Sequence, residues 1–245
     1  MTRHLVFVFA DHFEPDRPEA MEAWRRGCPR LERFRDSDGR PPRHTWFYDG
    51  LDGRVLDALG ALARAGLGEV EVHLHHGNDT AATLEEKIER IKEVYAGHGA
   101  LVLAGEPGRR AYGLVHGKWS LCNSRGAEHC GVNGELAVLK RTGCYADFTF
   151  PAWGRMNPRQ RNSIYYATDD ASRPKAYDRG TPVEVGRPAS GDLMIFEGPG
   201  DVSGLPARVA RHGLLRRVLN RLWLTTDITD WNPGEEGRLG RWVAR

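Results

Sequence analysis

Short apolar runs alternate with longer stretches of helical periodicity along the first 150 residues, and this alternation constrains the fold more than any other feature of the sequence. Apolar, β-branched and aromatic residues predict strands over residues 5–9, 44–48, 70–75, 112–115 and 145–150. Apolar residues at three- and four-residue spacing predict helices over residues 20–34, 51–65, 83–95 and 134–141. Because strand–helix–strand units build parallel sheets, we expect an α/β fold with a barrel-like parallel sheet.

Beyond residue 151 the periodic signal weakens. Residues 152–192 are polar and contain several prolines, so we expect a long loop excursion over one end of the sheet. One more strand is predicted over residues 193–196, and an arginine-rich amphipathic helix over residues 205–224. The chain contains no internal repeat and no obvious linker, so residues 1–245 are predicted to form a single domain.

The charges of the chain are nearly balanced, with 35 Lys and Arg residues, 33 Asp and Glu residues, and a formal net charge of +2. This balance argues against a nucleic-acid partner bound by bulk positive charge, and no polybasic segment points to a membrane surface. No segment approaches the roughly 20 apolar residues of a spanning helix. The N-terminus lacks the long apolar region of a signal peptide, so we expect a cytoplasmic protein.

The four cysteines form no C-x-x-C pair, which favours reduced thiols and the same compartment. Two interpretations of the central cysteines stay open. In the first, Cys122, His129 and Cys130 line a zinc site. In the second, they are ordinary residues of a loop and the core.

The strongest candidate site follows the third predicted strand, in the segment H-L-H-H-G-N-D over residues 73–79. Ligands of parallel α/β folds bind at the carboxyl ends of strands. Strand alternation sends His73 and His75 to the same face, and the chain then breaks at a glycine and turns His76 and Asp79 towards the rim. Imidazole and carboxylate groups at this spacing suit zinc or a similar divalent ion. The alternative is a solvated edge strand whose histidines only cover polar surface.

A second polar pair, Asp11 and His12, follows the first apolar strand, with Glu14 close behind. A carboxylate at this position could complete a metal-binding set or act as a general base. Taken alone, an aspartate after a strand is also typical of a helix N-cap. Both interpretations are open.

Further candidates lie at the end of the fourth strand and inside the fifth. His116 could act as a catalytic acid or stabilise an oxyanion, and Trp119 could stack on a sugar ring; alternatively, both belong to a packed loop. Asp147 lies within an apolar predicted strand, where a carboxylate needs a partner. It could orient a catalytic histidine or arginine, or form a structural salt bridge.

Taken in order, these segments resemble the motifs of the polysaccharide deacetylases, the NodB-homology group of carbohydrate esterases. That family opens with a strand ending in T-F-D-D, and F-A-D-H stands there in residues 9–12. Its second strand, of the A-T-F-F type, is matched by T-W-F-Y in residues 45–48. Its G-H-E-I-G-x-H segment is matched by G-E-V-E-V-H-L-H-H-G-N-D in residues 68–79. The likeness covers about residues 4–150 and indicates a divergent branch of the family.

The resemblance implies a deformed or incomplete (β/α) barrel and a metal-dependent hydrolase that removes N-acetyl or related acyl groups from a sugar. Its substrate would be a small-molecule or oligosaccharide N-acetylated sugar. By its register, Asp11, His75 and Asp79 take the places of the metal ligands, with His76 beside them. The ion implied is zinc in the first place, with cobalt, nickel or manganese as alternatives. Catalytic and substrate-contacting roles are expected of Asp11, His12, His116, Asp147 and Trp119.

The sequence departs from the family pattern at several positions. In one register Ala10 stands where the family has its general base, whereas a shift by one residue makes Asp11 the base and His12 a ligand; both registers stay open. V-H-G in residues 115–117 replaces the arginine–proline motif, and no late L-x-H histidine is found. The chain ends near the point where a final barrel strand would begin, through truncation or through loss in this branch.

These departures leave two other functions open. A degenerate, non-catalytic barrel would bind carbohydrate or a protein partner without chemistry. A glycoside hydrolase would use Asp11 and Asp147 as its two opposed carboxylates, which would have to lie within about 10 Å of each other.

Overall fold

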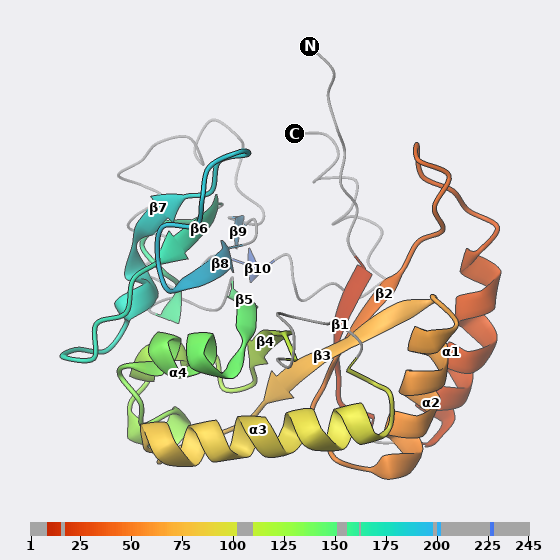
Figure 1. The fold of residues 1–245 in the computed structure, drawn as a ribbon, viewed down its shortest axis with the longest axis horizontal. Coiled ribbons are helices and arrows are strands. Elements are labelled where there is room, and N and C mark those ends of the chain that lie inside the picture. The colour runs from red at the N-terminus through yellow and green to blue at the C-terminus, as the bar shows by residue number, and fades with distance from the viewer. Residues whose placement is uncertain are drawn as a thin grey trace.

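The computed structural model of the chain describes residues 9–15, 18–101, 110–150, 156–161, 163–197, 200–201 and 226–227. Within these residues the protein is an α/β fold built on an eight-stranded sheet (Figure 1). The strands of this sheet are β1 (Phe9–Phe13), β2 (His44–Tyr48), β3 (Gly68–Leu74), β4 (Tyr112–His116), β5 (Cys144–Phe150), β6 (Ser163–Ala167), β7 (Gly180–Pro182) and β8 (Leu193–Glu197). The described α-helices are α1 (Pro18–Leu31), α2 (Gly53–Arg64), α3 (Ala81–Gly97) and α4 (Glu135–Thr142). A separate antiparallel pair is formed by β9 (Gly200–Asp201) and β10 (Thr226–Asp227).

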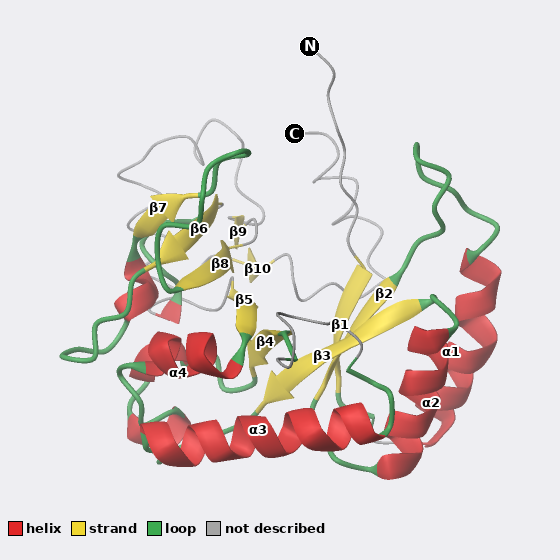
Figure 2. Ribbon diagram, in the orientation of Figure 1, coloured by secondary structure: helices red, strands yellow, loops and turns green. Residues whose placement is uncertain are grey.

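The strands are ordered β1-β2-β3-β4-β5-β8-β6-β7 across the sheet. The first six in this order are parallel, whereas β6 and β7 join antiparallel beside β8. Each crossover from β1 to β5 contains one helix and carries the chain to the adjacent strand. Crossovers between neighbouring parallel strands are almost always right-handed, which places successive helices on one side of the sheet. In Figure 2, α1 to α4 follow one another along the outside of the strands. Among the described strands β1 and β7 are the edges, so the sheet is open there.

The predicted α/β class is confirmed, and each helix predicted before residue 150 is present within a few residues of its expected bounds. Apolar residues at helical spacing place these helices, since each buries one face against the sheet. Of the first predicted strand, over residues 5–9, the structure describes only Phe9, and β1 extends from there to Phe13, beyond the predicted end. Residues 5–8 lie outside the described residues.

The second half of the chain contains more sheet than the sequence predicts. Residues 152–192, expected as a loop excursion, include β6 and β7. The alternate residues Tyr165 and Ala167 of β6 are buried, and this strand pairs with the predicted strand β8. The helix predicted over residues 205–224 lies outside the described residues.

The two faces of β3 have different surroundings. Val72 and Leu74 belong to the hydrophobic core between the sheet and its helices. Glu71 and His73 are also buried, but alternation places them on the opposite face. The register pairs Leu74 of β3 with His116 of β4, so His116 lies on the helix side. Polar groups that follow β3 and β4 are therefore distributed to both sides of the sheet.

Helix α3 begins soon after the histidine segment, and its start is fixed by a capping box. The Thr80 hydroxyl accepts from the N–H of Thr83 at 3.2 Å, and the Thr83 hydroxyl accepts from the N–H of Thr80 at 3.0 Å. This arrangement satisfies two of the amide groups that a helix N-terminus leaves without partners. Residues 75–79 consequently form a short turn between β3 and α3.

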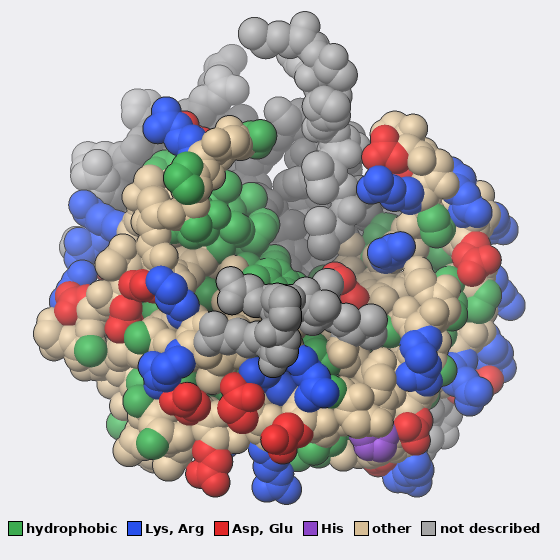
Figure 3. Space-filling model, viewed as in Figure 1, with side chains coloured by type: hydrophobic (Ala, Val, Ile, Leu, Met, Phe, Trp, Pro, Cys, Tyr) green, Lys and Arg blue, Asp and Glu red, His purple; other side chains and the backbone are tan. Residues whose placement is uncertain are grey.

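Basic and acidic side chains are mixed over the surface shown in Figure 3, in keeping with a net charge of +2. Several pair between elements: Arg141 Nη2 lies 2.6 Å from Glu85 Oε2 and joins α4 to α3, and Lys140 Nζ lies 2.7 Å from Asp192 Oδ1. In the part of the chain that the structure describes, no helix has the length and apolar character needed to cross a membrane.

Candidate metal centres

The carboxyl ends of β1, β2, β3 and β4 lie along one edge of the sheet, because these strands are parallel neighbours. Polar residues gather at this edge: Glu14 follows β1, Asp49 follows β2, His75 and His76 follow β3, and His116 ends β4. Since successive side chains of an extended segment alternate, His75 and His76 lie on opposite faces. Two separate groups of metal-binding side chains result.

The first group, termed the exposed group, consists of His12, Glu14 and His73, whose ligand atoms all lie within 4.8 Å of one another. Glu14 Oε1 lies 3.4 Å from His73 Nδ1 and 3.3 Å from His75 Nε2. His75 Nε2 also lies 3.7 Å from Asp49 Oδ2. The side chains of Glu14, His75 and Asp49 are 50%, 37% and 34% exposed, so solvent and a ligand can reach the group.

The electrostatics of the exposed group favour a bound cation. Burial, assisted by the neighbouring His12 and His75, lowers the pKa of His73 to about 3. The His73 ring is therefore neutral at physiological pH and offers a lone pair to a metal ion. Burial raises the pKa of Asp49; His75 opposes this shift, and the charge of Glu14 adds to it. A neutral imidazole beside carboxylates forms part of a donor set that suits zinc and similar divalent ions.

Gly117 supports the position of His75. Its N–H donates to the carbonyl of Leu74 at 3.0 Å, which holds the end of β3 beside the end of β4. A Cβ at Gly117 would lie 2.2 Å from His75 Cδ2, so a larger residue there would displace the imidazole ring from this position.

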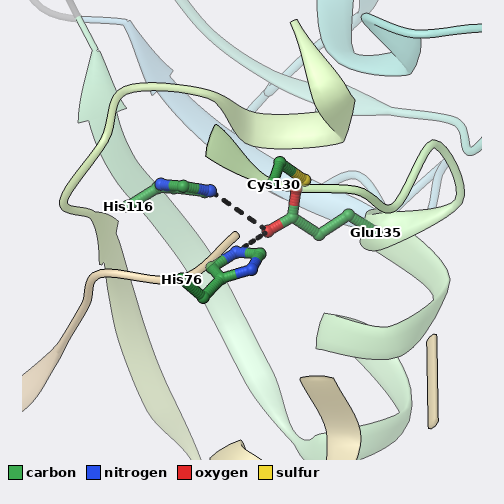
Figure 4. A group of neighbouring side chains, drawn as sticks. All are labelled: His76, His116, Cys130 and Glu135. Atoms are coloured by element: carbon green, nitrogen blue, oxygen red, sulfur yellow. Dashed lines mark hydrogen bonds and ion pairs between the residues drawn. The ribbon is translucent and has the colours of Figure 1, made fainter. Parts of the chain in front are cut away.

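The second group, termed the buried group, consists of His76, His116, Cys130 and Glu135 (Figure 4). These residues come from the turn after β3, the end of β4, the loop before α4 and the first residue of α4. Glu135 Oε1 lies 3.2 Å from His76 Nε2 and 3.9 Å from His116 Nε2. The Cys130 thiol donates to Glu135 Oε2 at 3.2 Å. All four ligand atoms lie within 4.8 Å of one another, so the group could hold a metal ion.

Every member of the buried group is shielded from solvent. Burial lowers the pKa of His116 to about 3 and raises that of the Cys130 thiol, so both side chains are neutral. Burial alone would raise the pKa of Glu135, but the hydrogen bond with His76 and the neighbouring imidazoles hold it below its ordinary value. The N–H of Cys122 also donates to Glu135 Oε2. An ionised carboxylate therefore lies at the centre of the group.

Asp79 orients His76 from the side opposite Glu135. Asp79 Oδ2 lies 3.1 Å from His76 Nδ1. Lys87 Nζ donates to both oxygens of Asp79 at 2.7 and 2.8 Å, and the Thr83 hydroxyl donates to Oδ1 at 2.7 Å. Burial alone would raise the pKa of Asp79, but these hydrogen bonds from Lys87 and Thr83 lower it. Asp79 thus engages Nδ1 of His76, and Nε2 of the same ring faces Glu135. In histidines that bind metals, one ring nitrogen is usually held by a carboxylate in this way while the other contacts the ion.

The sequence predicts one metal set of Asp11, His75, His76 and Asp79, and the structure distributes these residues among different contacts. His75 lies beside the exposed group, whereas His76 belongs to the buried group and contacts Asp79. Asp11 pairs with His44, whose Nε2 lies 3.2 Å from Asp11 Oδ1. Among the described residues Asp11 belongs to neither group.

The residues predicted to catalyse or to contact substrate are also separated. His12 belongs to the exposed group and His116 to the buried group. Asp147 is buried, its carboxylate accepts from the hydroxyl and the N–H of Thr149 at 2.6 and 3.2 Å, and burial raises its pKa to about 7. Trp119 packs against the hydrophobic core, with a backbone φ of 49°. The carboxylates of Asp11 and Asp147 are thus each engaged by other partners.

Glu135 and Asp49 are not among the residues predicted from the sequence, which places Cys130 with other partners. Glu135 lies in the first turn of a predicted helix, where a carboxylate is common, so no local signal marks it as a ligand. Asp49 directly follows a predicted strand, which is the signal that singles out the polar residues after the first and third strands. The sequence groups Cys130 with Cys122 and His129, whereas the structure joins Cys130 to the histidines and carboxylate of the buried group.

Comparisons of the chain with models of protein families, with curated proteins and with solved structures gave no match. The features of the chain that indicate its chemistry are therefore the two groups and their position in the fold. The decisive difference between them is access, because solvent reaches the exposed group and is excluded from the buried one.

Proposed function

We propose that this chain is a metal-dependent hydrolase whose reacting centre is the exposed group and whose substrate is an N-acetylated sugar or a related amide. One observation carries the proposal. His12, Glu14 and His73 bring their ligand atoms within 4.8 Å of one another at the carboxyl edge of a parallel sheet, where two of the three are exposed. Catalytic metal sites keep a coordination position open for water or substrate, and three ligands of which two are exposed meet that requirement.

The fold supports the same proposal. β1 to β5 follow chain order as parallel neighbours, β8 extends them, and the helices lie on one side, which is how (β/α) barrels are built. We infer that the sheet is part of a deformed barrel of the polysaccharide-deacetylase type. In barrels of this kind the reacting groups lie at the carboxyl ends of the strands, and the exposed group occupies that position.

The chain's own residues suggest a division of roles. A divalent ion held by the exposed group would polarise a substrate carbonyl and lower the pKa of a water molecule. Glu14 contacts both His73 and His75 and so orients the two rings. Asp49 lies beyond His75 and is placed to accept a proton from the attacking water. His75 lies between the two carboxylates and is placed to donate a proton to the departing amine.

The proposal is tested by measuring acetate release from N-acetylated mono- and oligosaccharides. The full chain is loaded with zinc, cobalt, nickel or manganese before the assay. We expect the wild type to release acetate, and His73→Ala and Glu14→Gln to lose at least about 100-fold in rate, since each removes a group that holds the ion. Glu22→Gln, which changes an exposed carboxylate on α1, is the matched control and should keep the wild-type rate.

Two outcomes would contradict this function. No acetate release from any substrate with any ion, from protein shown to be folded by circular dichroism, would favour a non-catalytic barrel, and calorimetry with the same sugars would detect its binding. Wild-type rates in both His73→Ala and Glu14→Gln would place the reaction elsewhere in the molecule.

A further inference from the structure

We propose that His76, His116, Cys130 and Glu135 form a closed, structural site for zinc or a similar divalent cation, distinct from the proposed reacting centre. The site would join the turn after β3 to the loop between β4 and α4 (Figure 4). This inference is independent of the proposed hydrolase activity, because it rests on the four buried side chains alone.

The four ligand atoms all lie within 4.8 Å of one another, which is close to the spacing of a tetrahedral site. Zinc lies about 2.0–2.3 Å from nitrogen, oxygen and sulfur ligands, which places tetrahedral ligand atoms about 3.3–3.8 Å from one another. Glu135 Oε1 lies 3.2 Å from His76 Nε2 and 3.9 Å from His116 Nε2, and Glu135 Oε2 lies 3.2 Å from Cys130 Sγ. An ion at the centre of the group would draw one carboxylate oxygen and the other three ligand atoms towards it.

One polar atom of the group has no hydrogen-bond partner, and a bound cation would provide one. His116 is fully buried, and its Nε2 has no hydrogen-bond partner among the described residues. Such an atom is unfavourable in a protein interior, and a bound ion would satisfy it. The N–H of Lys118 lies 3.2 Å from His116 Nδ1. Coordination through Nε2 moves the ring proton to Nδ1, and Lys118 then loses that acceptor, a small penalty beside four metal–ligand bonds.

The charges and donor types favour zinc over magnesium or calcium. A thiolate from Cys130 and the carboxylate of Glu135 carry two negative charges, which neutralise one divalent ion in a region without solvent. Binding releases the thiol proton to solvent. Imidazole and sulfur ligands select zinc and related transition metals, whereas magnesium and calcium take oxygen ligands. Four protein ligands with no solvent access leave no open position, which is typical of a structural site.

The loop before α4 has strained backbone conformations that a bound ion would stabilise. Trp119, Cys122 and Asn123 have φ values of 49°, 47° and 57°, which are unfavourable for residues with a Cβ. Strained conformations persist where the surroundings hold them firmly. The loop makes two backbone hydrogen bonds to the turn after β3, from Asn78 N–H to the Ala127 carbonyl at 2.6 Å and from Asp79 N–H to the Cys130 carbonyl at 3.1 Å. An ion shared by both segments would hold this arrangement.

Cobalt substitution tests the site directly. The full chain is stripped with a chelator and titrated with Co²⁺, and the absorption spectrum is recorded. We expect one equivalent of cobalt to produce a thiolate-to-cobalt charge-transfer band and the intense visible bands of four-coordinate cobalt, both displaced by zinc. Chelation should also lower the thermal unfolding temperature of the wild type, and zinc should restore it, a readout that needs no substitution.

Variants assign the band to the buried group. Cys130→Ser should abolish it, whereas Cys144→Ser should retain it, because Cys144 is also buried but lies on β5 outside the group. His73→Ala should also retain it, since that change affects only the exposed group. A folded wild type without a thiolate band, or a band that survives in Cys130→Ser, would overturn the proposal. If Cys130→Ser fails to fold, Glu135→Gln and the chelation experiment on the wild type decide between the same outcomes.

Discussion

His75 and His76 are neighbours in the sequence but contact carboxylates on opposite faces of the sheet. His75 Nε2 lies 3.3 Å from Glu14 Oε1, and His76 Nε2 lies 3.2 Å from Glu135 Oε1. Because side chains alternate along an extended segment, one strand end can serve two groups of different character. The contact of His75 is open to solvent, and that of His76 is buried.

Single substitutions at these two positions should affect different readouts, acetate release at His75 and the cobalt thiolate band at His76. His75→Ala should reduce acetate release at least about 10-fold, since Glu14 and Asp49 lose the ring between them, but should leave the thiolate band of the cobalt protein intact. His76→Ala should remove the band, because it deletes a ligand of the buried group. Both readouts are measured on the same preparations. Loss of the band in His75→Ala would contradict the separation of the two groups.

Asp79→Asn should weaken zinc binding at the buried group by about 10- to 100-fold, because His76 loses the carboxylate that orients its ring. The affinity is measured by competition with a chromogenic chelator. Asp57→Asn is the matched control, since Asp57 also pairs with a histidine, His98, at 2.7 Å but lies on α2 away from both groups. Equal zinc affinity in Asp79→Asn and the wild type would show that this carboxylate does not orient His76.

Gly131→Ala should destabilise the protein more than Gly126→Ala, although both glycines have positive φ values, of 98° and 93°. A Cβ at Gly131 would lie 2.4 Å from the backbone carbonyl oxygen of Asp79 and 2.6 Å from its backbone nitrogen, whereas a Cβ at Gly126 would have no neighbouring atom within 4 Å. Conformational strain alone should cost Gly126→Ala about 1 kcal/mol. Gly131→Ala should cost at least about 2 kcal/mol, because the turn after β3 must move. Urea unfolding of both variants provides the comparison, and equal losses would contradict the close approach.

Asp147 should make the protein less stable as the pH rises from about 4 to about 7. Burial raises the pKa of Asp147 from 3.8 to about 7. Between these values the folded protein keeps the Asp147 proton and the unfolded chain has lost it, so the folded state binds more protons and the free energy of unfolding falls with increasing pH. Below about pH 4 and above about pH 7 the contribution of Asp147 no longer changes.

Asp147→Asn isolates this contribution. The variant should gain stability relative to the wild type as the pH rises through the same interval, and the difference should be constant above about pH 7. Urea unfolding of both proteins at several pH values measures the difference. Parallel pH profiles would show that Asp147 titrates alike in the folded and unfolded states.

Several features of the fold could be predicted because they are local properties of the chain. Apolar spacing locates α1 to α4, and alternation along β3 places His73 and His75 on the same face, where their ring centroids are 4.8 Å apart. β6 and β7 were not predictable in this way, since they lie in a polar stretch with several prolines. β6 pairs with β8 and β7 pairs with β6, and these tertiary contacts determine the conformation of both strands.

Up to residue 150, periodicity predicts the order of strands and helices, and with it the presence of histidines and carboxylates at the carboxyl edge of a parallel sheet. Which of these side chains meet depends on tertiary contacts. Glu14 lies 61 positions from His75, and Glu135 lies 59 positions from His76. The physical reason is that periodicity reports the environment of one segment, whereas contacts across such separations depend on strand register and on the packing of helices against the sheet, which no local pattern encodes.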